Sequence, residues 1–353
     1  MATFSDPTFN AGLYESHRPR YFSNVAEQIL AYHATHQPPT EQPDATLTSS
    51  TAEPRSSKRL GLAVDLATGT GQLCKVLGPQ FDHVYGLDIS PTMISAAEPL
   101  PNVSYHLGSA EGDNPAWPDS IAPHSVDVVT VAEAAHWFDR PRAWSYIKHM
   151  LKPHGTLAVI SYSMPLLLDK PKAAQLLTAL ISGDDMLAPF WEPGRYEIET
   201  LYGHWDIPFG DLQRHYWPHS LLPPSSDTAI ADAAGAKNDV GKGNGNTETL
   251  DAEQLHRFWE SQTGNGVHLP APQPFMGALM SPTQFVAYMQ TWSGYKRYIQ
   301  AHPDRHAIIH NQVERMMAAE GCQDWDAPWP ISFNHALILG TNDVPEVPPR
   351  PTE

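Results

Sequence analysis

A glycine loop between two carboxylates is the part of this sequence whose residue types and spacing point most directly to chemistry. Asp65 lies in an apolar run, Gly69 and Gly71 follow it, and Asp88 ends the next apolar run. The two glycines let the backbone turn sharply and approach a ligand closely. A carboxylate at the end of the neighbouring strand can accept two hydrogen bonds from a ribose diol. The spacing therefore predicts a ligand that contains a ribose.

A nicotinamide dinucleotide is a rival ligand for such a loop. Its fingerprint needs a third glycine three residues after the second, but Cys74 stands there. The acidic Asp65 before the loop also suits a cationic ligand better than a diphosphate. An ordinary strand–turn–helix without a ligand remains an alternative. Cys74 is interpreted as a small packed side chain.

The elements around the loop predict a doubly wound α/β fold. Short apolar runs, typical of buried strands, alternate with helical stretches; the strands are expected at 62–67, 83–88, 103–107, 126–131 and 156–160, and the helices at 71–77, 91–98 and 140–151. Ligands of such mostly parallel sheets bind beyond the carboxyl ends of the strands, which is where the loop and Asp88 lie.

Five stretches of the chain resemble class I S-adenosylmethionine (SAM)-dependent methyltransferases. They are similar in particular to the trans-aconitate methyltransferase-like (methyltransferase type 11) group, which includes fungal small-molecule enzymes of secondary metabolism. The similar stretches are the glycine loop, Tyr14–Tyr21, Gly108–Glu111, Ala132–Phe138 and Thr291–Tyr295. The resemblance implies a mostly parallel, seven-stranded, Rossmann-like sheet with a helical cap.

The same resemblance implies that SAM is the cofactor and S-adenosylhomocysteine (SAH) the product. The implied cofactor-binding residues are Tyr14, Arg18, Asp65, Ala67, Gly69, Gly71, Asp88, Ile89, Ser109, Ala110 and Glu133. Two of them depart from the commoner pattern. Ala67 replaces the first glycine of the loop, which is tolerable if its φ is negative. Ser109 replaces an acidic residue that accepts a hydrogen bond from the adenine amine, and its hydroxyl is a weaker acceptor.

Some of these roles have structural alternatives. Arg18 is a candidate partner for the carboxylate of the cofactor, and its alternative is a surface ion pair. The alternative for Tyr14 is helix packing. Glu133 either touches the ammonium group of the cofactor or caps the following helix.

His136 is the candidate catalytic residue. Its ordinary pKa of about 6.5 suits a general base if the acceptor is a hydroxyl or a thiol. If the acceptor is a carboxylate, no base is needed, and His136 would orient the substrate or pack. Trp137, Trp292 and Tyr295 are the expected substrate-binding residues, with packing in the core as the alternative for each aromatic side chain.

No metal site is expected. Histidines recur every four residues at His302, His306 and His310, but no acidic or cysteine residue stands at a zinc-like spacing beside them.

Composition narrows the functional classes further. The net charge of −17 and the pI near 5.4 disfavour nucleic acid and anionic membranes as partners. No apolar run is long enough to span a bilayer, and no secretion signal is recognised. The two cysteines do not form a disulfide framework. We expect a cytoplasmic monomer or homodimer.

The expected domains follow from these patterns. An N-terminal lid region (1–36) and a flexible linker (37–58) precede the SAM-binding core (59–164), and a cap or substrate region (165–330) contains a disordered insertion (223–249). A C-terminal strand (331–343) completes the sheet, and a tail (344–353) follows.

The leading hypothesis is therefore a SAM-dependent methyltransferase that acts on a small-molecule carboxylate, hydroxyl or thiol, with O-methylation favoured. Its alternative is a SAM-binding protein without methyl transfer, either a scaffold or a rearrangement catalyst, because binding and chemistry are separable.

Overall fold

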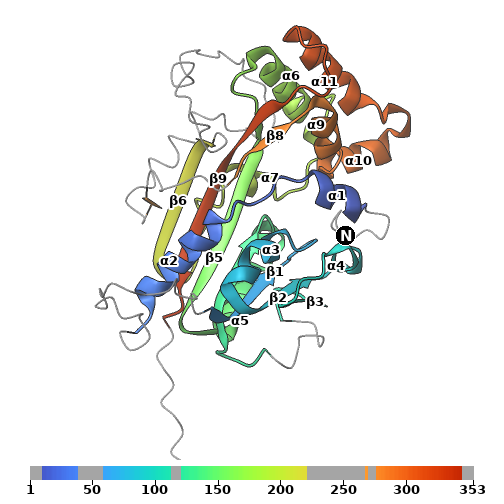
Figure 1. Ribbon diagram of the computed structural model, residues 1–353. Coiled ribbons are helices and arrows are strands. Elements are labelled where there is room, and N and C mark those ends of the chain that lie inside the picture. Colours follow the sequence, from blue (N-terminus) through green and yellow to red (C-terminus); the bar gives the residue numbers. More distant parts are fainter. Residues whose placement is uncertain (1–9, 39–58, 113–120, 221–266, 269–275, 344–353) are drawn as a thin grey trace, which may run out of the picture. The chain divides into compact units, whose positions relative to one another are not determined.

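The protein is described by a computed structural model that covers residues 10–38, 59–112, 121–220, 267–268 and 276–343 (Figure 1). The predicted insertion (223–249) and tail (344–353) lie outside the described residues, as do all but two residues of the predicted linker (37–58).

The chain forms two compact units, each of which is described by itself. The sheet unit comprises Tyr21–Ile160, Trp205–Arg214 and Leu337–Glu353, and the helical unit comprises Met1–Arg20, Ser161–His204 and His215–Ala336. Three long strands have residues in both units: β5 (Leu151–Leu166), β6 (Gly210–Ser220) and β9 (Trp329–Thr341).

The sheet unit alternates strands with helices along the chain. Its elements are α2 (Asn24–His36), β1 (Leu60–Leu66), α3 (Gln72–Leu77), β2 (Phe81–Asp88), α4 (Pro91–Ala96), β3 (Val103–Leu107), β4 (Val126–Ala132) and α5 (Arg140–Met150). The predicted strands and helices of this segment are all present, with ends that differ by a few residues. The expected strand at 156–160 is longer than predicted, because β5 begins at Leu151 and ends at Leu166.

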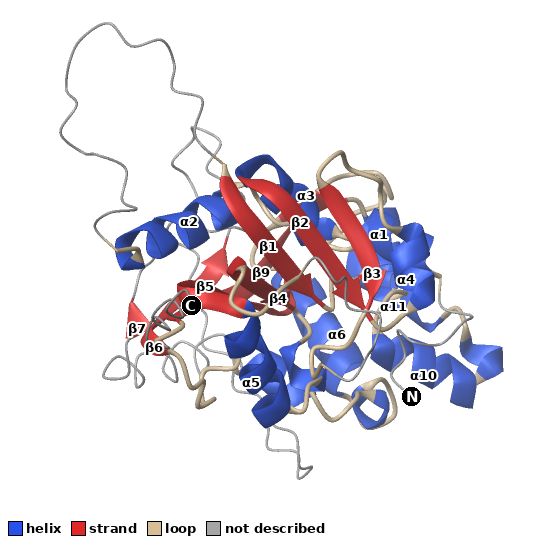
Figure 2. Cartoon of the chain, turned by 90° about the horizontal axis from the view of Figure 1, so that it is seen from below, coloured by secondary structure: helices blue, strands red, loops and turns tan. Residues whose placement is uncertain are grey.

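Parallel pairing places the carboxyl ends of β1, β2, β3 and β4 at one edge of the sheet. Figure 2 shows β3, β2 and β1 side by side in this order. In the register of these strands, Asp65 of β1 lies opposite Gly86 of β2 on one side and opposite Thr130 of β4 on the other. The doubly wound, mostly parallel α/β fold is thus confirmed.

The strand order is β3-β2-β1-β4-β5-β9-β6-β7, and β8 pairs with β9. Within the described residues this sheet has nine strands rather than the expected seven. The additional strands β7 (Val267–His268) and β8 (Ala278–Met280) are only two and three residues long.

Buried apolar side chains explain why these strands form. The four valines of β4 are fully buried, as expected for a central strand covered on both faces. Helix starts follow from local capping: the Ser90 side chain accepts a hydrogen bond from the backbone at Met93 to begin α4, and Asp139 likewise begins α5.

The helical unit contains α1 (Ala11–His17), α6 (Pro171–Ser182), α7 (Arg195–Glu199), α9 (Pro282–Met289), α10 (Ser293–Ala301) and α11 (Ile308–Ala319). α9 begins with a capping box formed by Ser281 and Gln284. α6 and α11 pack together, and the Gln312 amide of α11 donates to the Leu176 carbonyl of α6 over 2.8 Å. Many buried side chains of this unit are aromatic, among them Phe285, Tyr288 and Phe333.

Candidate functional site

The glycine loop (residues 67–71) joins β1 to α3 in a strained conformation. Ala67, Gly69 and Gly71 have φ values of 53°, 60° and 82°. The condition under which alanine is tolerable at this position, a negative φ, is therefore not met. An L-residue in this left-handed region is less stable by roughly 1–2 kcal/mol, so the surrounding structure must hold Ala67 there.

The two glycines of the loop differ in what surrounds them. A Cβ at Gly71 would overlap the hydroxyl of Tyr105, a side chain of β3 that packs against the loop. A Cβ at Gly69 would meet no atom within 4 Å. The backbone at Gly69 therefore faces open space that a ligand can enter.

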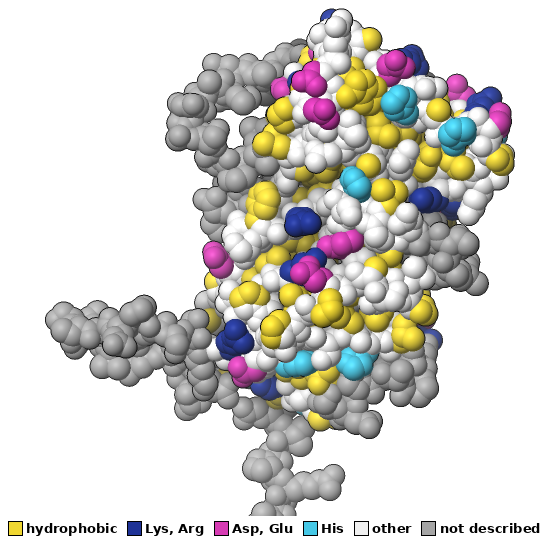
Figure 3. Space-filling model, turned by 45° about the vertical axis from the view of Figure 1, so that its right-hand side comes forward, with side chains coloured by type: hydrophobic (Ala, Val, Ile, Leu, Met, Phe, Trp, Pro, Cys, Tyr) yellow, Lys and Arg dark blue, Asp and Glu magenta, His cyan; other side chains and the backbone are white. Residues whose placement is uncertain are grey.

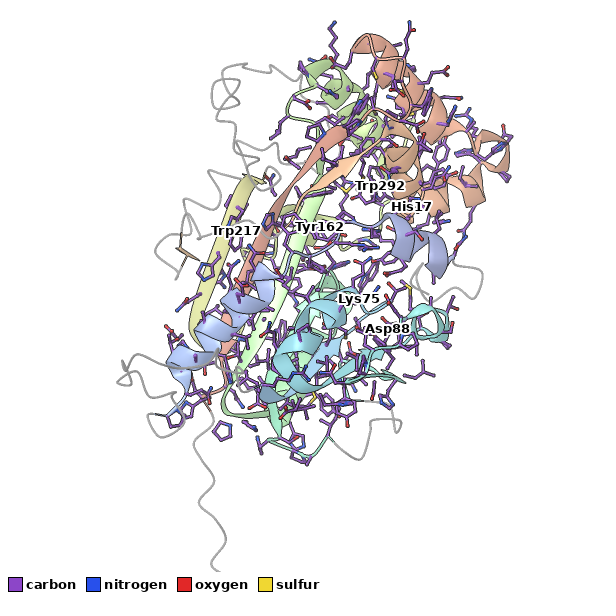
Figure 4. The ribbon with its side chains drawn as sticks, viewed as in Figure 1. His17, Lys75, Asp88, Tyr162, Trp217 and Trp292 are labelled. Carbon is purple, nitrogen blue, oxygen red and sulfur yellow. The ribbon has the colours of Figure 1, made fainter. Side chains whose placement is uncertain are left out.

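Asp88 stands beside this open space, at the end of β2 (Figure 4). Its Oδ2 accepts a hydrogen bond from the Gly69 amide over 2.8 Å, and its Oδ1 accepts one from the Ser90 amide over 2.8 Å. Burial raises the pKa of Asp88, and the hydrogen bonds from the Ser90, Gly69 and Ile89 amides lower it; the net pKa is raised. A carboxylate has about four lone-pair positions, so the side chain retains acceptor capacity for a diol.

Asp65 is held entirely by donors of the protein. Its Oδ2 accepts from the Thr68 hydroxyl over 2.6 Å and its Oδ1 from the Thr130 hydroxyl over 2.6 Å. The Cys74 thiol lies 3.7 Å from Oδ2. Burial raises the pKa of Asp65 to about 6, although these hydrogen bonds act in the opposite direction.

Large apolar side chains are exposed at the same edge of the sheet. Ile89 follows β2, Leu107 ends β3 and Trp137 follows β4, and their side chains are 60%, 39% and 37% exposed. Exposed apolar side chains that gather beside open backbone are typical of a ligand-binding crevice. Ile89 and Leu107 lie at the ends of neighbouring strands, since Asp88 pairs with Leu107 in the parallel register.

Ser109 and Ala110 follow β3. Ala110 is buried, and the Ser109 hydroxyl donates to the Glu111 carboxylate while its oxygen accepts from the Glu111 amide over 3.0 Å. The carboxylate of Glu111 also accepts from the Asp139 amide over 3.1 Å. Glu111, the acidic residue of the Gly108–Glu111 stretch, was not among the predicted site residues.

The segment after β4 contains Glu133, His136 and Trp137. Glu133 has a φ of 53°, so a second strained residue lies at the carboxyl end of a strand adjacent to β1. The His136 and Trp137 rings are tilted, with centroids 4.7 Å apart. Burial lowers the pKa of His136 to about 3. The value near 6.5 on which its predicted role as a base rested does not hold here, and the imidazole is neutral at physiological pH.

The helical unit contains the remaining candidates, beginning with Arg18. Its Nη1 donates to the Tyr162 hydroxyl over 3.2 Å and its Nη2 to the Thr291 carbonyl over 3.5 Å (Tyr162 is marked in Figure 4). The guanidinium also lies 4.8 Å from the centroid of the Tyr14 ring and 5.8 Å from that of Tyr288. Burial lowers the pKa of Arg18, but these tyrosines raise it, and the net pKa lies above the ordinary value.

Trp292 and Tyr295 pack in the interior of the helical unit, where they are 2% and 8% exposed. The Trp292 ring lies 5.8 Å from that of Trp191 and 5.6 Å from that of Tyr288. The Tyr295 hydroxyl donates to the His306 carbonyl over 3.0 Å. Both side chains thus have packing partners within their own unit.

Charged side chains of both signs lie interspersed on the face drawn in Figure 3. Among the basic residues that could bind an acidic substrate, Arg195 is paired with Glu199 over 2.5 Å and Arg140 stacks on Trp205. The His310 ring stacks on Trp325 at 4.6 Å. Within the described ranges, no three His, Cys, Asp or Glu side chains are grouped so that they could hold a metal ion.

Most of the predicted site residues lie in the sheet unit, at or after the carboxyl ends of its parallel strands: Asp65, Ala67, Gly69, Gly71, Asp88, Ile89, Ser109, Ala110, Glu133, His136 and Trp137. Tyr14, Arg18, Trp292 and Tyr295 lie in the helical unit. Thr68 and Thr130, whose hydroxyls donate to Asp65, were not among the predicted site residues. A threonine within the valine-rich run of β4 is the signal that marks Thr130.

Comparisons with known proteins agree with this arrangement. Residues 64–159, which contain the glycine loop, Asp88 and His136, match the family model described as a methyltransferase domain. That segment is therefore similar to a methyltransferase domain, and its fold is Rossmann-like.

Individual relatives extend the similarity. The chain is 22% identical over 348 residues to the probable S-adenosylmethionine-dependent methyltransferase CRG1 of Saccharomyces cerevisiae, covering 96% of this chain and 97% of CRG1. It is 27% identical over 160 residues to the methyltransferase ptaI of Pestalotiopsis fici, which covers 43% of this chain and 42% of ptaI. The chain thus spans nearly all of one curated relative and less than half of another.

A solved structure supports the fold over most of the chain. The putative type II methyltransferase from Anaeromyxobacter dehalogenans superposes with a TM-score of 0.56 at 20% identity, over 92% of this chain and 98% of that one. In the part of the chain that the structure describes, no helix is long and apolar enough to cross a membrane.

Proposed function

We propose that this protein is a SAM-dependent methyltransferase that acts on a small molecule. When bound, the cofactor supplies an electrophilic methyl group on a sulfonium sulfur. The match of residues 64–159 to a methyltransferase domain supports the reaction class. The observation that carries the proposal is the open space at Gly69, bordered by the Asp88 carboxylate.

The residues of the sheet unit fit the parts of the cofactor. Asp88 would accept hydrogen bonds from the ribose hydroxyls, and the backbone at Ala67, Gly69 and Gly71 would lie beside the ribose and the methionyl chain. The exposed Ile89 and Leu107 side chains offer an apolar surface to the adenine. Ser109 and Ala110 would flank the ring, and Glu111 supplies the carboxylate that Ser109 lacks.

Three further residues would complete the binding of the cofactor. The guanidinium of Arg18 is the proposed partner of the cofactor carboxylate, because ion pairs with hydrogen bonds are the strongest way to hold such a group. Tyr14 packs on that guanidinium and would keep it in place. Glu133 is the proposed partner of the ammonium group.

The low pKa of His136 bears on the class of acceptor. An imidazole whose protonated form has a pKa of about 3 has a low affinity for a proton, so His136 is a weak general base. This favours an acceptor that is already ionised, above all a carboxylate, over an alcohol. We therefore propose O-methylation of a carboxylate, in which the neutral His136 and the exposed Trp137 orient the acceptor.

The test is calorimetric titration of the purified chain with SAH, using wild type, Asp88→Asn and Asp82→Asn. The control residue Asp82 is exposed at the other end of β2. We expect micromolar binding by wild type and Asp82→Asn. Asp88→Asn should bind about 10–100-fold more weakly, because hydrogen bonds to a charged acceptor contribute about 1.5–3 kcal/mol.

A second assay follows SAH formation with a panel of carboxylic acids, phenols and thiols. Absence of SAH binding to wild type would overturn the proposal. Binding without turnover of any acceptor would leave the alternative, a SAM-binding protein that does not transfer methyl groups.

A further inference from the structure

The strained backbone at Ala67 requires a restraint, and the hydrogen bonds of the loop identify one. Thr68, the next residue, donates its hydroxyl to Asp65, and its amide donates to the Leu87 carbonyl over 2.9 Å. The Gly71 amide in turn donates to the Thr68 carbonyl over 3.0 Å. Thr68 therefore connects the middle of the loop to β1 and β2.

Asp65 is itself fixed from the opposite side by β4. Thr130 lies directly across from Asp65 in the parallel register and donates to its free oxygen over 2.6 Å. Thr130 is fully buried and Asp65 is 1% exposed, so water does not compete for this contact. The hydrogen bond is charge-assisted whenever Asp65 is ionised, and such bonds are stronger than neutral ones.

We propose that Thr130 is a positioning residue for cofactor binding: through the Asp65 carboxylate and Thr68, it holds residues 67–71 in their strained conformation. This inference rests on the proposed function, since it assigns the conformation of the loop to binding of the cofactor. Thr130 does not itself need to touch the ligand. Asp65 then acts mainly through Thr68 rather than as a direct contact.

The backbone geometry gives the proposal a specific consequence. Glycine adopts a positive φ without the steric penalty that alanine has. If Thr130 is needed because Ala67 is strained, Ala67→Gly should make the loop less dependent on Thr130. The two substitutions should therefore be non-additive, with Ala67→Gly restoring part of what Thr130→Val removes.

Thr156 provides a matched control on the neighbouring strand. It is also fully buried, but its hydroxyl pairs with the His33 ring over 2.9 Å and not with the loop. Thr156→Val also removes a buried threonine hydroxyl from this sheet. Thr156 lies two residues before Ala158, the residue of β5 that pairs with Thr130.

The experiment measures SAH affinity by calorimetry and thermal stability for the full chain with Thr130→Val, Thr156→Val, Ala67→Gly and the double variant Ala67→Gly/Thr130→Val. We expect Thr130→Val to weaken SAH binding about tenfold or more, as for a lost hydrogen bond to a charged group. Thr156→Val should change affinity less than about twofold despite a comparable loss of stability. The double variant should bind more tightly than Thr130→Val.

The pH dependence provides a readout that packing alone would not change. The Thr130 hydroxyl lowers the pKa of Asp65, so its removal should move the acid limb of SAH binding to higher pH. The other groups that face Asp65 are Thr68, the Cys74 thiol and the Asp88 carboxylate, and all of them remain in the variant. Thr156→Val should leave the acid limb in place.

Each outcome decides the inference. Equal SAH affinity of Thr130→Val and wild type would overturn it, and so would equal weakening by Thr156→Val. If Thr130→Val does not fold, Thr130→Ser, which keeps the hydroxyl, must bind like wild type while Thr130→Ala must not. Failure of wild type to bind SAH would instead count against the proposed function.

Discussion

Two charged side chains, the buried Asp65 of the sheet unit and the half-buried Arg18 of the helical unit, have different kinds of partner. In the sheet unit, the Asp65 carboxylate accepts hydrogen bonds from a hydroxyl of the glycine loop, a hydroxyl of β4 and a thiol of α3. In the helical unit, the Arg18 guanidinium contacts a phenol, a carbonyl and aromatic faces, and none of the ion pairs among the described residues includes it. Its Nε is buried without a hydrogen-bond partner in the described part of the chain.

The contacts of the Asp65 carboxylate therefore lie within its own unit, whereas the Arg18 guanidinium retains capacity to bind an anionic ligand. Both oxygens of Asp65 already accept short hydrogen bonds from side chains of its own unit. A half-buried cation whose hydrogen-bond partners are neutral retains capacity for an anion. The comparison is consistent with the proposed positioning role of Asp65 and with the proposed role of Arg18 as partner of the cofactor carboxylate.

The largest expected effect comes from Arg18→Met, which keeps much of the length of the side chain but removes its charge. We expect SAH binding to weaken about 10–100-fold because a charge-assisted contact with the carboxylate is lost. Calorimetric titration measures it. Arg20→Met, at an exposed position two residues away, is the control. An unchanged affinity in Arg18→Met would mean that Arg18 only packs between the tyrosines.

Asp65→Asn should separate binding from stability in the sheet unit. Burial raises the pKa of Asp65 to about 6 in the folded chain, from 3.8, so the folded state keeps the proton between these pH values and the unfolded state does not. Stability from this group therefore falls as the pH rises from about 4 to about 6 and is constant above.

The asparagine variant lacks this dependence on pH. At pH 8 we expect the variant to be as stable as wild type or more stable, by up to about 3 kcal/mol in the free energy of unfolding, with a melting temperature that is equal or higher. The difference should vanish near pH 4. The SAH affinity of the variant should nevertheless fall, because the loop loses a charged anchor. Thermal unfolding of both proteins at several pH values tests this. If the melting temperature of the variant minus that of wild type were smaller at pH 8 than at pH 4, the prediction would be contradicted.

The smallest effect is expected at His136. Because its pKa is about 3, the imidazole does not change protonation between pH 5.5 and 9. His136→Gln should lower the rate of SAH formation by no more than about tenfold, below the range of general base catalysis, and leave the shape of the pH profile unchanged. Initial rates with a turned-over acceptor measure both quantities. A loss of more than 100-fold together with a lost limb near pH 6.5 would restore the role of general base.

Much of the sheet unit follows from short-range sequence patterns. The apolar runs ending at Leu66 and Asp88, and the helix starts at Pro91 and Arg140, are encoded within a few residues, since burial and capping are local signals. The glycine loop was recognised for the same reason. The positions of Asp65 and Asp88 at one edge also follow, because parallel strands bring their carboxyl ends together.

The conformation and the charges of the site are decided by tertiary structure. Ala67 has a positive φ, and no local pattern of an alanine predicts it. The pKa of His136 depends on burial, which is a property of the folded chain rather than of the residue. Likewise, the partnership of Thr130 with Asp65 joins residues 65 positions apart, and only the strand register creates it. The sequence by itself determined which chemical groups are present and at which strand ends they lie, whereas the fold decided which of them are ionised and which remain open to a ligand.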